Sequence, residues 1–226
     1  MTSLTCYINI SDIIIPLITI PIIDLILCLI FGTLSRWFQL HSVINAIIVS
    51  IIYKDIIELY INPLNNKLVD TKLDCYYVIF LHIYHLFISK QLSFMDYFHH
   101  IIFIGFGCGP AFLTYNNNLM RLSLFASCGF TGAIEYFTLA LVKHKKLNVL
   151  IQKKLNAYMY NYLRYPLSMY SIIATYIVYR QNPFLIDNLW LFTYINLMIF
   201  FNGSFYNKLT IENYIEYKLI KMNTNI

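Results

Sequence analysis

The stretch IIIPLITIPIIDLILCLIFGTL, at residues 13–34, decides the fold class of this chain. Its only charged residue is Asp24. A helix needs about 20 mostly apolar residues to cross the hydrocarbon core of a bilayer, so this stretch is long enough to span it. No basic segment precedes the stretch, whereas a cleaved signal peptide would begin with one. We therefore expect residues 13–34 to remain as a membrane-spanning helix.

The composition of the whole chain favours the same class. Of its 226 residues, 59% are hydrophobic and 12% are charged, where a soluble domain carries about 25% charged residues. The mean hydropathy is +0.61, and the apolar residues fall in long runs rather than in half-polar stripes. The charges are too few to coat a soluble domain of this size. The net charge of +5 comes without the basic and aromatic face that nucleic acid needs, so no nucleic-acid partner is expected.

The apolar runs predict an all-α integral membrane protein with about seven transmembrane helices. The predicted spans are residues 13–34, 39–61, 73–90, 97–114, 119–141, 157–180 and 185–207. Short segments with turn residues connect them at 62–66, 115–118 and 180–184. No internal repeat or low-complexity linker divides the chain. It is expected to comprise an N-terminal helix at 1–34, a membrane domain at 35–207 and a tail at 208–226.

The basic residues predict the orientation, because loops on the cytoplasmic side are enriched in Lys and Arg. With seven spans, the first, third and fifth loops share a side with the C-terminal tail. Ten of the 16 basic residues fall there: Arg36, Lys90, Lys143, Lys145, Lys146, Lys153, Lys154, Lys208, Lys218 and Lys221. The C-terminus is therefore expected in the cytoplasm.

Eight titratable residues lie inside the predicted spans, where such groups are costly and mark functional sites by default. They are Asp24, His41, His82, His85, His99, His100, Glu135 and Arg164. Seven of them fall in the cytoplasmic leaflet, which predicts a shared polar pocket that opens toward the cytoplasm. Structural roles are the alternative: hydrogen bonds between helices for the histidines and Asp24, and an ion pair between Glu135 and Arg164.

The pair His99-His100 is the hardest of these to explain structurally. Adjacent side chains on a helix point about 100° apart, so one imidazole at most faces a given partner. We expect one ring to face the pocket and the other to secure it.

These histidines also carry a family resemblance. The segments DYFHHIIFIGFGCGPAF (96–112) and NNLMRLSLFASCGFTGAIEYFTLALVKHKKLN (117–148) resemble the centre of the TLC domain. That domain is shared by ceramide synthases, translocation-associated membrane proteins and smaller multi-pass proteins. SRWFQLHSVINAIIVS (35–50) and LDCYYVIFLHIYHLFI (73–88) resemble its earlier spans. The resemblance covers roughly residues 35–205, and it implies six helices in a barrel around a lipid-accessible cavity in the endoplasmic reticulum or another endomembrane.

The resemblance also implies roles for particular residues. His99, His100 and Glu135 match the catalytic positions, and Asn118 and Arg121 match the next polar positions of ceramide synthases. The His-Asp step of those enzymes is absent, since its region reads CGFTGAIE. Thr138 follows Glu135 as in the smaller TLC proteins, although Leu139 replaces their proline. The remaining polar residues of the predicted pocket are His41, His82, His85 and Arg164.

Two functions follow from this resemblance. The first is a protein that binds, senses or transports membrane lipids, or maintains their composition. The second is an N-acyltransferase that joins an acyl-CoA to a long-chain amine, with a histidine as nucleophile or general base. In both, membrane lipids are the partners and no cofactor is implied.

A membrane metalloenzyme is a third alternative. Three of the six histidines would suffice for one zinc ion, but the HxxxH and HxxHH patterns of membrane hydroxylases and desaturases do not occur. The five cysteines are scattered, without a CxxC pair, and indicate neither a disulfide framework nor a structural zinc site. No metal ligand is therefore assigned. A retinal-binding protein is excluded, because the last span contains no lysine.

Overall fold

The computed structural model describes residues 9–65, 67, 69, 71–89, 92–114, 117–181 and 189–224. Most of these residues are helical, and none of them forms a β-strand. The elements are α1 (Ile10–Phe31), α2 (Arg36–Ile61), α3 (Leu73–Ile88), α4 (Phe94–Phe98), η1 (His99–Cys108), α5 (Gly109–Thr114), α6 (Asn118–Leu124), η2 (Phe125–Gly129), α7 (Phe130–Lys143), α8 (Val149–Met159), η3 (Tyr160–Arg164), α9 (Tyr165–Gln181) and α10 (Leu189–Thr224). Cys6, Lys90 and parts of the predicted connections at 62–66, 115–118 and 180–184 lie outside the described residues.

Three helices are long and apolar enough to cross a membrane: Ile10–Phe31, Arg36–Ile61 and Asn118–Lys143. The prediction of an all-helical membrane protein is confirmed to this extent. The predicted spans 73–90 and 97–114 correspond to helical segments that are shorter or interrupted. Helix α10 runs on to Thr224, so that most of the segment predicted as a tail is a continuation of the last helix.

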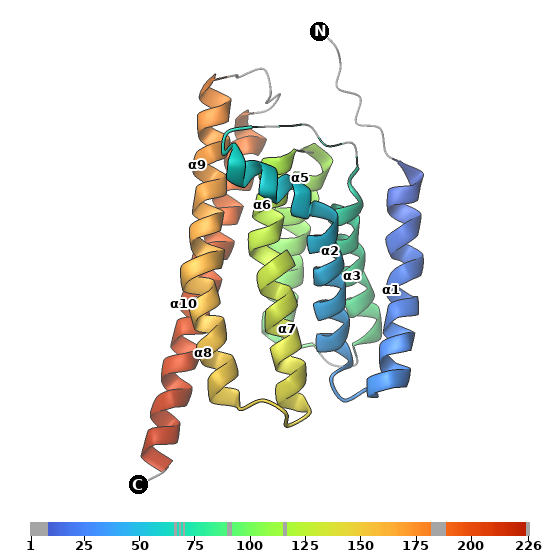
Figure 1. The fold of residues 1–226 in the computed structure, drawn as a ribbon, viewed down its shortest axis with the longest axis vertical. Helices are drawn as coiled ribbons and strands as arrows, with labels where there is room; N and C mark the ends of the chain where they lie inside the picture. The colour runs from blue at the N-terminus through green and yellow to red at the C-terminus, as the bar shows by residue number, and fades with distance from the viewer. Residues whose placement is uncertain are drawn as a thin grey trace.

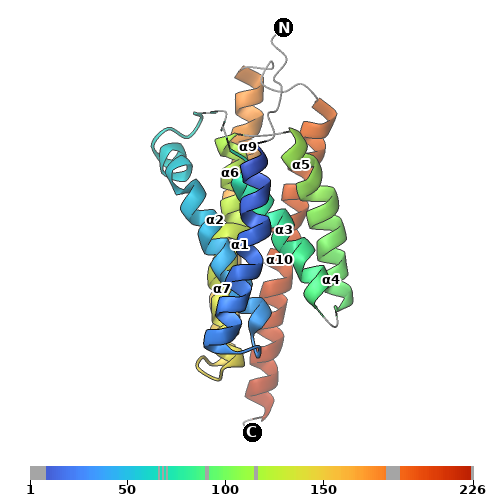
Figure 2. The same cartoon turned by 90° about the vertical axis from the view of Figure 1, so that its right-hand side faces the viewer.

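The helices run side by side along the long axis of the molecule, and the two termini lie at opposite ends (Figure 1). The α1–α2 and α7–α8 connections lie toward the same end as the C-terminus, and the last turns of α10 project beyond its neighbours there. Helix α1 packs against α2 and α3 at the edge of the bundle, and Figure 2 shows it in front of α3. The end that carries the C-terminus is called the C-terminal end below.

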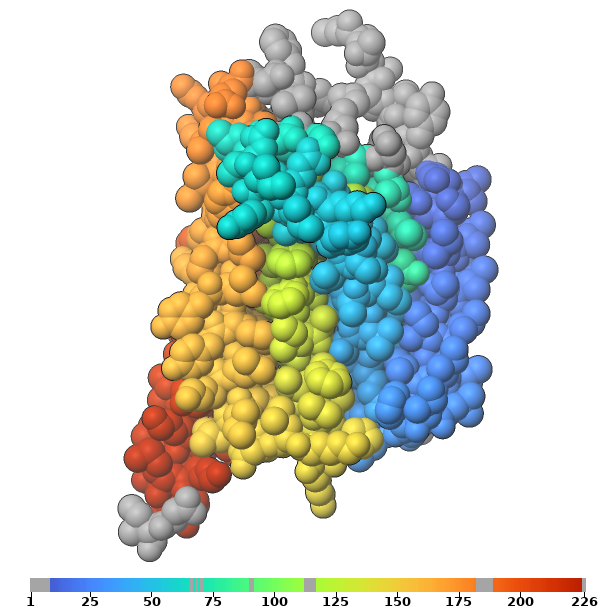
Figure 3. Space-filling view, viewed as in Figure 1, coloured from blue at the N-terminus to red at the C-terminus, as the bar shows by residue number. Residues whose placement is uncertain are grey.

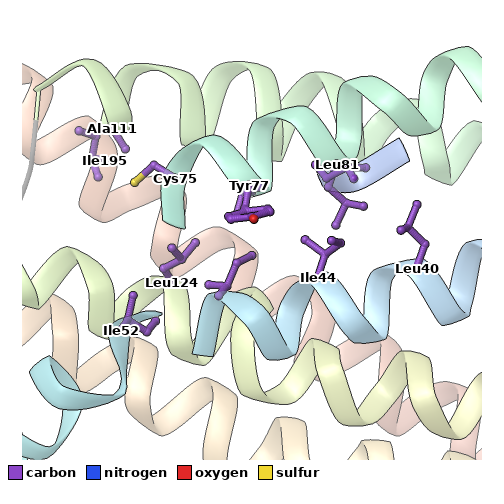
Figure 4. Close-up of a cluster of buried hydrophobic side chains, with 12 residues drawn as sticks. Leu40, Ile44, Ile52, Cys75, Tyr77, Leu81, Ala111, Leu124 and Ile195 are labelled. Carbon is purple, nitrogen blue, oxygen red and sulfur yellow. The ribbon is translucent and has the colours of Figure 1, made fainter. Parts of the chain in front are cut away.

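A ridge of aliphatic side chains on α2 forms the centre of the core. Leu40, Ile44, Ile48 and Ile52 recur every fourth residue, which places them on one face of the helix, and each is fully buried. They pack against Val78 and Leu81 of α3 and against residues of α6 and α10 (Figure 4). This cluster fixes α2 and α3 relative to each other, and both helices carry histidines of the predicted pocket.

Close packing of α7 on α2 completes this part of the bundle. A Cβ atom added to Gly132 would lie only 2.6 Å from the side-chain nitrogen of Asn45. Glycine therefore lets the two helices approach closely. In the space-filling view α7 lies between α2 and α8 (Figure 3).

The outer surface of α1 is apolar. Large aliphatic side chains are exposed along it, among them Leu17, Ile18, Leu25, Ile26 and Leu29. Exposed apolar surface of this extent needs a partner, and lipid tails supply one for a helix that crosses a membrane. On its inner side Asp24 is buried and accepts hydrogen bonds from the Arg36 guanidinium and from the Tyr84 hydroxyl. This ion pair anchors α1 to α2 and α3.

Candidate functional site: a polar cavity with an apolar arm

A cavity of about 310 Å³ lies inside the bundle, and we call it the polar cavity. Helices α2, α3, α4, α7 and α10 and all three π-helical segments contribute to its wall. Its histidine, acidic and basic side chains are His41, His82, Asp96, His99, Glu135 and Arg164. Met95 of α4 and Asn213 of α10 lie at its C-terminal end. Five of the eight titratable residues expected inside the spans therefore share one cavity.

The three π-helical segments each interrupt an α-helix where it borders this cavity. His99 and Phe103 of η1, Cys128 of η2 and Arg164 of η3 all line the wall. A π-helix inserts an extra residue per turn, which redirects the side chains that follow, and such segments occur frequently at functional sites. The backbone is thus irregular where it faces the cavity.

A chain of hydrogen bonds links two of the histidines to a tyrosine. His82 Nδ1 lies 2.7 Å from the Val78 carbonyl oxygen, His82 Nε2 lies 3.2 Å from His99 Nε2, and His99 Nδ1 lies 2.8 Å from the Tyr206 hydroxyl. A carbonyl oxygen only accepts, so a neutral His82 donates from Nδ1 and accepts at Nε2. A neutral His99 then donates from Nε2 and accepts at Nδ1 from Tyr206. One set of tautomers therefore gives every hydrogen bond in the chain one donor and one acceptor.

His85 and His100 pack behind this chain. His100 Nε2 lies 3.1 Å from His85 Nδ1, and neither residue belongs to the cavity wall. The Trp37 ring stacks on His85 with a centroid distance of 3.3 Å and meets His41 edge-on at 3.7 Å. Of the adjacent pair, His99 faces the cavity and His100 is held against α3. This is the division expected for neighbouring side chains on a helix.

Glu135 lies in the wall and is held by α8 and η3. Its carboxylate accepts hydrogen bonds from the Asn156 amide at 3.1 Å and from the Tyr160 hydroxyl. Thr138 donates from its hydroxyl to the Glu135 carbonyl oxygen, and it lies outside the cavity wall. Tyr160 and Asn156 therefore position the carboxylate, while Thr138 belongs to the helix behind it.

Arg164 lies across Tyr160 from Glu135. Its guanidinium carbon is 4.5 Å from the Tyr160 ring centroid and 5.1 Å from the Tyr206 ring centroid. One of its terminal nitrogens donates to the Asn202 side-chain oxygen at 2.8 Å. Among the described residues, no carboxylate oxygen lies within 4.0 Å of this guanidinium. The direct ion pair between Glu135 and Arg164, one of the alternatives that the sequence left open, is not formed.

Asn118 and Arg121, by contrast, are not part of the cavity. Arg121 forms ion pairs with Asp55 at 2.5 Å and Asp74 at 3.3 Å. Asn118 accepts a hydrogen bond from the Lys67 amide and donates one to the Asn65 carbonyl. Arg121 therefore joins α6 to α2 and α3, and Asn118 joins α6 to the segment between those two helices. The family resemblance implied that they belong to the pocket, but tertiary packing places them in a separate polar network.

Several uncharged members of the site could not be identified from the sequence: Asn45, Asn156, Tyr160, Asn202 and Tyr206. Asparagine and tyrosine are abundant in this chain, so that none of them stands out singly. A periodic signal was nevertheless present. Asn156, Tyr160 and Arg164 recur every fourth residue, as do Asn202 and Tyr206, and such spacing places them on one face of a helix.

An apolar arm adjoins the polar cavity. It has a volume of about 70 Å³ and is lined mainly by apolar side chains of η1, α5, α6 and α10. Phe103, Cys108, Ser127 and Asn202 line both spaces, so that the arm begins where these four residues lie. Met120 and Met198 also line the arm. Methionine side chains adapt to different ligand shapes because they are unbranched and flexible.

The described residues contain no group of three or more His, Cys, Asp or Glu side chains placed to hold a metal ion. Three histidines that share one zinc ion, the third alternative from the sequence, are therefore not found in this arrangement. In comparisons with known proteins, the chain matched no protein-family model, no curated protein and no solved structure.

Proposed function

We propose that this chain is a multi-pass membrane protein of the TLC type that binds a membrane lipid in its central cavity. In this proposal seven segments span the bilayer, the C-terminus lies in the cytoplasm, and the host membrane is the endoplasmic reticulum or another endomembrane. The motifs around His99, His100 and Glu135 and the distribution of basic residues support these assignments. The biological role is lipid sensing, lipid transport or the maintenance of lipid composition.

The observation that carries the proposal is the junction of two unlike spaces. The polar cavity offers imidazole, carboxylate, guanidinium and phenol groups, while the apolar arm offers almost only hydrocarbon. An amphiphile has the same division into a polar head and an apolar tail. Ligand sites typically combine apolar walls with a few polar groups that fix orientation, and here the histidines and the charged groups line the polar cavity and not the arm.

Binding accounts for the geometry better than catalysis does. A general base needs an imidazole nitrogen within hydrogen-bond reach of its substrate. Both nitrogens of His99 are engaged by Tyr206 and His82, and His100 lies outside the cavity wall. In this conformation the two histidines of the pair bond to other side chains, His99 to Tyr206 and His82, and His100 to His85. They do not present a free nitrogen to the cavity.

Acyl transfer is the second candidate, and the hydrogen-bonded chain favours it. A substrate that displaces Tyr206 would meet His99 Nδ1 with its lone pair exposed, since the chain of tautomers makes this nitrogen an acceptor. The amine nitrogen would then attack the carbonyl carbon of an acyl-CoA thioester while His99 accepts the amine proton. The new C–N bond would replace the C–S bond, and the coenzyme A thiolate would leave with the proton returned by His99. Lipid profiles of cells that express the protein test this candidate. New amide-linked lipids, lost with His99→Ala and His100→Ala, would establish it, and an unchanged profile would eliminate it.

Substitution at the junction tests lipid binding directly. Ser127 lines both the polar cavity and the arm, so Ser127→Phe should fill the passage between them. Ser50→Phe is the matched control, because Ser50 lies on the exposed face of α2. Lipids that co-purify with each protein are extracted from washed detergent micelles and quantified by mass spectrometry.

We expect a stoichiometric lipid with the wild type and with Ser50→Phe, and loss of most of that lipid with Ser127→Phe. All three proteins should elute at the same volume in gel filtration, which establishes that they are folded. An equal lipid content in the wild type and in folded Ser127→Phe would refute binding at this site.

A further inference from the structure

Arg164 differs from the other arginines that are buried or half-buried in the described bundle. Arg36 pairs with Asp24, and Arg121 pairs with Asp55 and Asp74. Arg164 is only 5% exposed. Yet among the described residues the only hydrogen bond that its guanidinium donates goes to the neutral Asn202. Its Nε atom is fully buried and has no partner in this part of the chain.

A guanidinium buried in this position destabilises the folded protein unless it has a counter-ion. Burial of a charge costs several kcal/mol unless the charge is paired and its donors are satisfied, and the cost inside a membrane is of the same order. The rings of Tyr160 and Tyr206 offset part of it through cation–π contacts. The two rings do not accept N–H···O hydrogen bonds in the plane of the guanidinium. The Nε–H donor in that plane therefore has no partner among the described residues.

Glu135 does not act as the direct counter-ion. Its two carboxylate oxygens are taken by Asn156 and Tyr160, and Tyr160 lies between it and the guanidinium. The Arg164 side chain lines the polar cavity. Its missing partner must therefore come from the contents of that cavity.

The position of Arg164 relates this charge to the apolar arm. Asn202, which holds the guanidinium by one terminal nitrogen, lines both the polar cavity and the arm. A group bound at Arg164 would therefore sit at the mouth of the arm. A hydrocarbon chain attached to that group could enter the arm between η1, α6 and α10.

From this geometry we infer that the ligand of the cavity is an amphiphile with an anionic head group, a carboxylate or a phosphate, and that Arg164 is its counter-ion. The inference rests on the proposed function and specifies the ligand class. Carboxylate and phosphate oxygens both match the donor fork of a guanidinium. The charge of Arg164 selects the sign of the head group.

Four probes with the same hydrocarbon chain separate the contribution of the head group from that of the tail. They are palmitate, hexadecyl phosphate, the neutral hexadecanol and the cationic hexadecylamine, each titrated at pH 8 against the full-length protein in a non-ionic detergent. The measurement is the displacement of a radiolabelled palmitate tracer and, in parallel, direct binding of labelled hexadecanol. The affinities for palmitate and for hexadecyl phosphate are then compared, to decide whether the natural ligand carries a carboxylate or a phosphate head group.

We expect the anions to bind the wild type about ten to a hundred times more tightly than hexadecanol, because hydrogen bonds to a charged group are each worth about one to two decades of affinity. Arg164→Gln should remove this difference and leave the affinity for hexadecanol unchanged. Arg164→Lys keeps the charge without the fork and should keep part of the preference. Arg180→Gln, an exposed arginine near the end of α9, should behave as the wild type.

If Arg164 had only a structural role, Arg164→Gln would make the ligand-free protein less heat-stable than the ligand-free wild type. The inference predicts a different result. Loss of an unpaired buried charge should leave the ligand-free Arg164→Gln protein at least as heat-stable as the ligand-free wild type, and only the stabilisation by added palmitate should disappear. Equal binding of palmitate and hexadecanol to the wild type would overturn the inference and leave lipid binding intact. Failure of every probe to bind the wild type would overturn lipid binding itself, and the inference with it.

Discussion

The ion pairs of Arg121 allow the sharpest test of the fold, and we predict that Arg121→Met lowers the free energy of unfolding by about 3–5 kcal/mol. The side chains of Arg121 and Asp74 are 7% and 1% exposed, and their nitrogen and oxygen atoms lie 3.3 Å apart. One Asp74 oxygen already lacks a partner among the described residues. Removal of the guanidinium would leave a buried carboxylate without its counter-ion, and this desolvated charge is the source of the loss.

The measurement is the unfolding of purified protein in mixed micelles by titration with a denaturing detergent, followed by tryptophan fluorescence. Lys67→Met is the matched control, because Lys67 also pairs with a carboxylate, that of Glu58, but with side chains 53% and 32% exposed. An exposed pair contributes about 0–1 kcal/mol. The two substitutions remove the same charge and differ chiefly in the burial of the partner that is left behind.

The double substitution Arg121→Met with Asp74→Asn separates charge from packing. It should recover most of the loss, because residues of one ion-pair network do not act additively. The reasoning would be refuted if Arg121→Met cost no more than Lys67→Met, or if the double variant were as unstable as Arg121→Met alone. Either result would mean that Asp74 is not held as a buried charge.

Two further predictions concern packing and topology. Gly132→Ala should lower the free energy of unfolding by about 1–3 kcal/mol, since the new Cβ atom would meet the Asn45 amide at 2.6 Å, while Gly109→Ala, whose nearest contact would be 3.8 Å, should be neutral. Equal effects of the two substitutions would contradict close packing of α7 on α2. An epitope tag after residue 226 should bind antibody in cells whose plasma membrane alone has been permeabilised, as the distribution of basic residues predicts. Exposure of that tag only after all membranes are dissolved would reverse the proposed orientation.

The amino-acid sequence by itself determined the class of the fold. Long apolar runs such as residues 13–34 admit few structures besides membrane helices, because a bilayer leaves backbone groups no partners outside the segment. The sequence also identified the polar residues that a membrane helix would not carry without reason. Hydropathy and the energetic cost of burying a charge are properties of each residue and its chain neighbours. They can therefore be assessed from the sequence without knowing the tertiary contacts.

Only the tertiary structure decided which of those residues belong together. Arg121 and Arg164 look alike in the sequence, each a single arginine within an apolar segment. Packing gives Arg121 two carboxylates and gives Arg164 two aromatic rings and the wall of a cavity. Partners such as Tyr206 and Asn202 come from a helix far away in the chain, and the π-helical segments decide which side chains face inward. Such contacts depend on how helices pack against one another, which no local pattern contains.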